Sequence, residues 1–139
     1  MSLYVLDTDI VTLFRGGHAR VCQHVGSHAP AELAITVLTV EEQLTGWYGL
    51  LRRVKQPPQL AWAYQQLADS VRFFSLLPIL SYSLSAISCY DRLRALNLNV
   101  RKMDLRIAAV VLENGGVLVS RNLRDFRRIP NLTVEDWSV

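Results

Sequence analysis

Two carboxylates one residue apart, Asp7 and Asp9, end the apolar run in "YVLDTDI", and a helix-like apolar pattern follows at once. A short core strand rarely needs an acid at its end, and one Asp suffices to cap the next helix. Asp7 follows four apolar residues, where a carboxylate is costly unless something binds it. The pair therefore indicates a site that holds positive charge, with Asp9 as the expected cap of a helix that ends near Phe14.

Other acids suggest what that charge is. Four of them lie, like Asp7, close to a predicted boundary between a strand and a helix or near the start of a helix: Glu41, Glu42, Asp104 and Asp125. Clustered carboxylates repel one another, so that one or more takes up a proton unless a cation is present. Mg²⁺ suits such a group, because it takes few protein carboxylates, keeps waters and bridges to substrate phosphates. The predicted chemistry is hydrolysis of phosphodiester bonds with the help of Mg²⁺ or Mn²⁺.

The elements that must position these acids alternate between strands and helices. Strands are predicted over residues 3–6, 33–36, 73–78 and 115–120, with a short edge strand over 132–137, and helices over 9–14, 18–27, 38–53, 60–71, 83–96 and 102–114. Such alternation is typical of an α/β domain with a mostly parallel sheet of four or five strands and helices on both faces. We expect one domain over residues 1–139, with its own hydrophobic core.

This topology brings the acids to one edge of the sheet. Parallel sheets bind ligands outside the carboxyl ends of their strands. Asp7 ends the first strand, and Glu41 and Glu42 lie in the first turns of the helix after the second strand. Asp104 begins the helix that leads into the fourth strand, and Asp125 follows that strand. Acids from four segments should therefore meet at one rim, although each alone also suits a cap or a surface ion pair.

The charge of the chain points to a polyanionic partner. It has 15 Lys and Arg against 12 Asp and Glu, and residues 101–128 hold seven basic residues and three acids. Such a cluster is most often a solvated surface, but it also suits RNA. The longest apolar stretch, "FFSLLPIL", is too short to span a bilayer, and we expect no signal peptide or membrane association. Cys22 and Cys89 are expected to be buried thiols in a reducing cytoplasm.

Three stretches together resemble a known family: "LYVLDTDIV", "TVEEQLTGW" and "MDLRIAAVVLENGGVLVSRNLRDFRRIPNLTVEDW". In order and spacing they are similar to PIN-domain ribonucleases, specifically the VapC-type toxins of type II toxin–antitoxin systems. The resemblance runs from the first strand to the last and is least distinctive over residues 55–80. Its most specific part is the acid before "IAA", the glycine turn, the strand and the Arg-Asn-x-x-Asp-Phe segment that follows.

The resemblance implies a PIN-like fold, a metal-dependent endoribonuclease and a role for individual residues. Asp7 and Asp104 match the acids that bind the metal, and Glu42 matches the second acid, four residues before Gly46. The fourth acid is matched by Asp125, or else its place is taken by Asn122. Four further residues are assigned to positioning the substrate or a ligand water: Ser120, Arg121, Asn122 and Arg124.

Three positions depart from the family pattern. Position 9, usually Asn, is Asp9 here, which adds charge near the metal or caps the helix. Asn97 replaces the usual glycine before the third acid, and Asn also accepts left-handed backbone angles. Gln43 stands where the family has Leu after the second acid. None of these changes removes a predicted metal ligand, so an active nuclease is expected.

The resemblance also implies partners. A cognate VapB-like antitoxin is expected to wrap the toxin and block its acidic cleft, a homodimer is usual, and the substrate is RNA, with tRNA favoured by the C-terminal pattern. Four aromatic residues, Trp47, Tyr48, Trp62 and Tyr64, either supply apolar grooves for these contacts or belong to the core.

Other functions share parts of this pattern. A PIN fold can bind RNA or protein without cutting it, although the intact acids count against that alternative. A haloacid-dehalogenase-like phosphatase has its nucleophile in Asp-x-Asp after the first strand, as in "LDTDI", but it needs an adjacent Asp pair late in the chain that is missing. Zinc on His24 and His28 lacks a third ligand.

Overall fold

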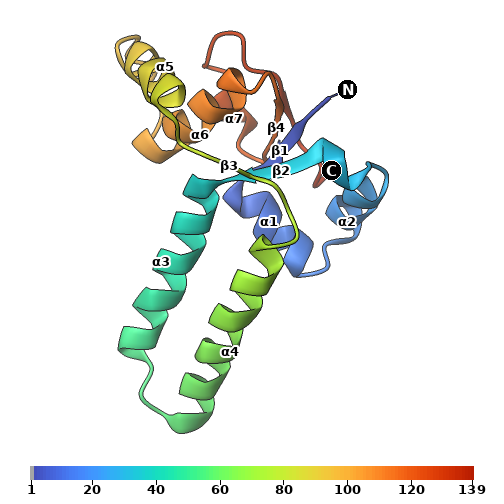
Figure 1. Ribbon diagram of the computed structural model, residues 1–139, viewed down its shortest axis with the longest axis vertical. Coiled ribbons are helices and arrows are strands. Elements are labelled where there is room, and N and C mark those ends of the chain that lie inside the picture. Colours follow the sequence, from blue (N-terminus) through green and yellow to red (C-terminus); the bar gives the residue numbers. More distant parts are fainter. Residues whose placement is uncertain (1) are drawn as a thin grey trace.

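The computed structural model describes residues 2–139 and shows five parallel strands in one sheet (Figure 1). The strands are β1 (Tyr4–Leu6), β2 (Leu33–Thr36), β3 (Ile79–Leu80), β4 (Val117–Val119) and β5 (Val134–Glu135), and their spatial order is β3-β2-β1-β4-β5. The first strand is thus central, with β2 and β3 on one side of it and β4 and β5 on the other. The predicted parallel α/β fold, with β5 as an edge strand, is confirmed.

Seven α-helices and a 3-10 helix connect the strands within residues 2–139. They are α1 (Thr8–Arg15), α2 (Ala19–Gly26), η1 (Pro30–Glu32), α3 (Val37–Arg53), α4 (Pro57–Phe74), α5 (Leu84–Arg94), α6 (Lys102–Glu113) and α7 (Leu123–Phe126). The predicted helices are all present, with ends that shift by up to a few residues. Within the described residues, none of these helices is both long and apolar enough to cross a membrane.

The core lies on both faces of the sheet because successive strand residues point to opposite sides. Val5 of β1 packs in a cluster with the buried faces of α5 and α6, whereas its neighbour Leu6 packs with α1, α2 and the end of α4. The segment Ile107–Val111 of α6 is entirely buried, which explains its unbroken apolar sequence. Helices therefore cover both faces, as predicted (Figure 1).

The third strand differs from its prediction. Residues 73–78 were predicted to form it, but α4 continues to Phe74 and the strand begins only at Ile79. The run "FFSLLPIL" cannot distinguish a strand from a buried helix end by periodicity alone. Phe74 is buried against the sheet as part of α4, and Pro78, which lacks an N–H, precedes the strand and accepts a hydrogen bond from Ile35 instead.

Helices α3 and α4 form a long hairpin that extends away from the sheet (Figure 1). Pro57 and Pro58 begin α4, where a missing N–H costs no helical hydrogen bond. Trp47 and Trp62 meet edge to face at 5.9 Å between ring centroids, which joins the two helices. Trp62 and Tyr64 remain more than half exposed. These aromatic side chains therefore lie mainly on the hairpin surface and not in the core.

The C-terminal segment closes the other edge of the sheet. Trp137 is buried, and the rings of His24 and His28 both stack on it, at centroid distances of 5.2 and 4.9 Å. The two histidines are thus used in aromatic packing. The N–H of Ser120 donates to the carbonyl of Glu135 at 2.9 Å, so β5 holds the residue that follows β4.

Candidate active site

Asp7 is fixed by the strand before it and the helix after it. Its N–H donates to the carbonyl of Val119 at 3.0 Å, and its Oδ1 accepts from the N–H of Ile10 at 2.9 Å, which makes it the N-cap of α1. The prediction that Asp9 caps this helix is wrong, because α1 already begins at Thr8 and Asp9 lies in its first turn. Asp7 is therefore both the cap of α1 and a buried acid of the site.

The environment of Asp7 disfavours its charged form. Its side chain is 7% exposed, and burial raises its pKa to about 6. Interactions with Ser120 and with the Ile10 N–H lower this pKa, whereas the negative charges of Asp9 and Asp104 raise it further. A cation beside the carboxyl group would reverse the balance and keep it ionised. Asp7 thus lies in a position that favours binding of a positive ion.

Asp104 comes from the opposite side of the cleft, in the first turn of α6, and is 6% exposed. Arg101, which precedes the helix, donates to both oxygens of this carboxylate: from Nε to Oδ2 at 3.2 Å and from Nη2 to Oδ1 at 3.1 Å. The loop that leads to this helix contains Asn97, whose φ of 52° is left-handed as predicted. Asp104 is thus a buried acid whose charge is balanced by an arginine of the same chain.

Glu42 reaches the cleft from the second turn of α3. It accepts a hydrogen bond of 2.6 Å from the hydroxyl of Thr8, and the Thr8 oxygen is also 3.1 Å from the hydroxyl of Thr39. Its neighbour Glu41 is exposed and does not line the cleft. Glu42 is therefore the acid of this pair that faces the site, and a threonine from α1 orients it.

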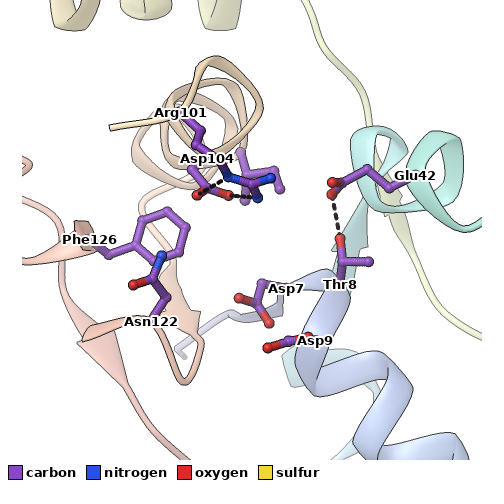
Figure 2. A pocket seen from close by; sticks show the side chains of 9 residues that line it. Asp7, Thr8, Asp9, Glu42, Arg101, Asp104, Asn122 and Phe126 are labelled. Atoms are coloured by element: carbon purple, nitrogen blue, oxygen red, sulfur yellow. Dashed lines mark hydrogen bonds and ion pairs between the residues drawn. The ribbon is translucent and has the colours of Figure 1, made fainter. Parts of the chain in front are cut away.

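These side chains enclose a cleft with a volume of about 210 Å³ (Figure 2). Nine residues line it: Asp7, Thr8, Asp9, Glu42, Arg101, Asp104, Ile107, Asn122 and Phe126. In Figure 2 the carboxylates of Asp7 and Asp9 lie below the ion pair of Arg101 and Asp104, with Glu42 on one side and Asn122 on the other. Of the acids predicted to converge, Asp7, Glu42 and Asp104 therefore do lie on one cleft.

The segment after β4 places Asn122, not Asp125, on the wall of the cleft. Asn122 caps α7, accepting from the N–H of Asp125 at 3.4 Å, while its Nδ2 donates to the Asp125 carboxylate at 3.0 Å. Asp125 also forms an ion pair of 3.2 Å with Arg128. The buried hydroxyl of Ser120 accepts from the N–H of Asn122 at 3.0 Å. Ser120 and Asp125 thus hold Asn122 in place.

The two arginines assigned to substrate positioning differ in their surroundings. Arg121 donates to Asp9 at 3.0 Å, which links the loop after β4 to α1 at the edge of the cleft. Arg124 is exposed on α7 and does not line the cleft. Of the two, Arg121 is therefore the one in direct contact with an acid of the cleft.

The donor set suits a hard divalent cation that keeps most of its water. Among residues 2–139, no three His, Cys, Asp or Glu side chains are close enough together to form a ready-made metal cage. Mg²⁺ does not require one, since it commonly binds through one or two carboxylates and substrate phosphate. Asp7 and Asp104 offer such oxygens from opposite walls, and the raised pKa of Asp7 indicates that positive charge is favoured there.

Comparison with known proteins shows similarity to VapC and VapBC proteins. No family model matches the chain. Ribonuclease VapC2 of Rickettsia felis is 35% identical over 69 residues, which is 47% of this chain and 52% of that relative, so the match spans about half of the relative's length. The crystal structure of VapBC2 from Rickettsia felis, bound to promoter DNA, has a TM-score of 0.72 with 25% identity, covering 97% of this chain and 98% of that chain.

The DNA-bound VapBC of Salmonella typhimurium superposes still better, with a TM-score of 0.79 and 26% identity over 99% of each chain. The chain thus has the fold of chains in these VapBC complexes, and about half of it is similar in sequence to a VapC ribonuclease. This similarity confirms the resemblance to VapC-type proteins found in the sequence and favours it over the phosphatase alternative. The similarity also agrees with the arrangement of the cleft, because Asp7, Glu42 and Asp104, the acids that the resemblance singled out, all line it.

The sequence analysis did not single out four residues that line this cleft. Thr8 had a signal, since it stands between the two acids of "LDTD". Ile107 and Phe126 form its apolar side and look in the sequence like ordinary core residues. Arg101 was counted only among the basic residues of the C-terminal third, because a single sequence does not show which way its side chain points.

Proposed function

We propose that this VapC-type chain is a metal-dependent endoribonuclease. The observation that carries the proposal is the meeting of Asp7, Glu42 and Asp104 on one cleft, where burial raises the pKa of Asp7 to about 6. Carboxylates held in this way favour a cation, and the basic surface beside them favours a phosphate chain. A relative named as a ribonuclease supports the choice of RNA as the substrate.

Asp7 and Asp104 would hold the metal ion, Mg²⁺ or Mn²⁺. Bound there, the ion supplies Lewis acidity toward a phosphodiester and a water of lowered pKa. The Ile10 N–H keeps the Asp7 carboxylate oriented. Glu42, oriented by Thr8, accepts a proton from the attacking water, and Asn122 presents its amide to a phosphate oxygen. Arg121 and Arg124 bind neighbouring phosphates, which places the scissile bond over the acids.

The proposal includes partners. Both structural relatives described above are VapBC complexes, and we propose that a VapB-like antitoxin binds and blocks this chain. The α3–α4 hairpin offers an apolar surface with Trp62 and Tyr64 exposed. The indole N–H of Trp47 is buried without a hydrogen-bond partner among residues 2–139. A partner chain bound to this hairpin would supply the missing acceptor. A homodimer and a tRNA substrate are further parts of the proposal.

Cleavage of labelled total tRNA by the purified, antitoxin-free chain tests the activity. The assay compares Mg²⁺, Mn²⁺ and EDTA, and it compares the wild type with Asp7→Asn and with Asp69→Asn. The second variant is the matched control, because Asp69 is a half-exposed acid that pairs with Arg72 on α4 and does not line the cleft. Discrete fragments are expected from the wild type and from Asp69→Asn, and none with EDTA or from Asp7→Asn.

A second candidate function is RNA binding without cleavage. The ion pair that engages both oxygens of Asp104 favours it, since a permanently occupied acid cannot serve a metal. Folded protein that retains labelled tRNA on a filter but yields no fragments with either metal would establish this function in place of the nuclease.

A further inference from the structure

One basic side chain stands among the acids of the cleft. Of the nine described residues that line it, Arg101 alone is basic. Its guanidinium engages both oxygens of Asp104 in a fork of two hydrogen bonds, 3.2 and 3.1 Å long. Such bidentate pairs are stronger and better oriented than single contacts of the same charges. The carboxylate assigned to the metal is therefore already bound to a cation, one supplied by the chain itself (Figure 2).

Arg101 also interacts with acids beyond its immediate partner. Its pKa is raised mainly by the hydrogen bonds and charge of Asp104, and further by the charges of Glu42 and Asp125. These acids belong to α6, α3 and α7. The guanidinium thus lies in the combined field of several segments, where a divalent cation would also be most favoured.

We propose that Arg101 is a built-in competitor of the divalent cation: it neutralises the cleft of the metal-free chain and must leave Asp104 before the metal binds. This inference rests on the proposed metal site and concerns its regulation. A guanidinium and a divalent ion cannot both sit against the same carboxylate without repelling each other, so each weakens the binding of the other.

The position of Arg101 allows it to leave. Its side chain is 71% exposed, whereas that of Asp104 is 9% exposed, so the arginine reaches down from the surface onto a buried acid. Its backbone lies outside the helix, with φ of −57° and ψ of 148°, and its side chain does not cap α6. Moving it therefore breaks one ion pair without disturbing the helix. The competition should weaken metal binding without preventing it.

Direct measurement of Mn²⁺ binding tests this inference without any cleavage assay. Free Mn²⁺ is followed by electron paramagnetic resonance in titrations of the metal-free wild type, Arg101→Gln, Arg101→Lys and Arg127→Gln at fixed ionic strength. Arg127→Gln is the matched control: it removes the same charge from an exposed residue that forms no ion pair within residues 2–139. It corrects for the general effect of net charge.

Arg101→Gln is expected to bind Mn²⁺ about three- to tenfold more tightly than Arg127→Gln, because an exposed partner of a buried acid contributes modestly. Arg101→Lys keeps the charge but loses the fork, and its affinity should fall between those of the wild type and Arg101→Gln. The rise in melting temperature on saturation with Mn²⁺ should also be largest for Arg101→Gln, because its metal-free cleft has the least balanced charge.

Equal Mn²⁺ affinities of Arg101→Gln and Arg127→Gln, or a weaker affinity of Arg101→Gln, would overturn the inference and leave the metal site standing. Failure of the wild type and of all three variants to bind Mn²⁺, with circular dichroism showing folded protein, would overturn the metal site and this inference together.

Discussion

The hydroxyl of Thr8 donates a 2.6 Å hydrogen bond to Glu42, 34 positions away in the sequence, and so connects the start of α1 to the second turn of α3. Thr8, the residue that follows Asp7, thereby orients the carboxylate of Glu42. Thr39 lies within 3.1 Å of the same hydroxyl, so the contact is supported from the α3 side as well. The orientation of the Glu42 carboxylate in the cleft thus depends on Thr8, a side chain without charge.

Replacing Thr8 by Val should release Glu42 while keeping the shape of the side chain. We expect cleavage to fall by about tenfold, since a misplaced proton acceptor typically costs one or two orders of magnitude. The free energy of unfolding should fall by about 1 kcal/mol. Thr45→Val, on the exposed side of α3, is the control and should change neither quantity. Unchanged cleavage by Thr8→Val would show that the hydrogen bond does not orient Glu42 for the reaction.

Asp7 caps α1 and is proposed to bind the metal, and substitutions can separate these two roles. Asn also caps helices well, so Asp7→Asn should retain the stability of α1 while losing the metal ligand. Asp7→Ala should lose both, so its free energy of unfolding should be about 0.5–2 kcal/mol lower than that of Asp7→Asn. Cleavage should be abolished in both variants, and urea denaturation distinguishes them. Equal stability of Asp7→Ala and Asp7→Asn would contradict the capping role seen in the structure.

The raised pKa of Asp7 predicts how stability depends on pH. The ordinary pKa of this carboxyl group is 3.8, and in the folded chain it is about 6. Between these values the folded chain binds more protons than the unfolded one, so the free energy of unfolding falls as the pH rises through this range. The loss due to Asp7 is on the order of 3 kcal/mol.

Urea denaturation in EDTA from pH 4 to pH 7.5 checks this, with Asp7→Asn as the reference that lacks the titrating group. The difference in stability between wild type and variant should move against the wild type as the pH rises. Saturating Mg²⁺ should reduce the loss at neutral pH, because the ionised carboxyl group then has a partner. Parallel curves for the two proteins would mean that Asp7 titrates as it does in the unfolded chain.

The contacts around Asn122 predict which residue of the last segment matters more. Asn122 lines the cleft, while Asp125 holds it through a 3.0 Å hydrogen bond and pairs with Arg128. Asn122→Ala should therefore lower cleavage by about ten- to a hundredfold, an effect of a lost substrate contact. Asp125→Asn keeps an oxygen that can accept from Asn122 and should lower cleavage less. The opposite order in single-turnover rates would assign the fourth site position to Asp125.

Most of the fold could be predicted from the sequence, because its main elements have strong local patterns. The strand Leu33–Thr36 and the helix from Lys102 were placed correctly, since each is an apolar run or face bounded by a clear break. The strand Ile79–Leu80 was missed because it has only two residues and follows a helix end with the same apolar composition. Short edge elements are set by their neighbours, which a local pattern does not include.

The candidate site was predictable in its acids and not in their contacts. Topology alone brought Asp7, Glu42 and Asp104 to one rim. The cap at Asp7 and the cleft position of Asn122 depend on where a helix starts to within one residue, which sequence patterns do not resolve. The pairing of Arg101 with Asp104 depends on side-chain direction before a helix. These contacts determine how the charges of the cleft are balanced, and they depend on the three-dimensional arrangement of side chains.

The stacking of His24 and His28 on Trp137 predicts where mutations in the gene should inactivate the protein. A nonsense mutation that removes only Trp137 and the residues after it would uncover both rings and open the core beside β5, whose Glu135 holds Ser120 next to the acids. For the nuclease proposed above, alleles that abolish activity should therefore gather in two distant places. One is the set of codons for the acids, and the other is the codon for Trp137 and those just before it.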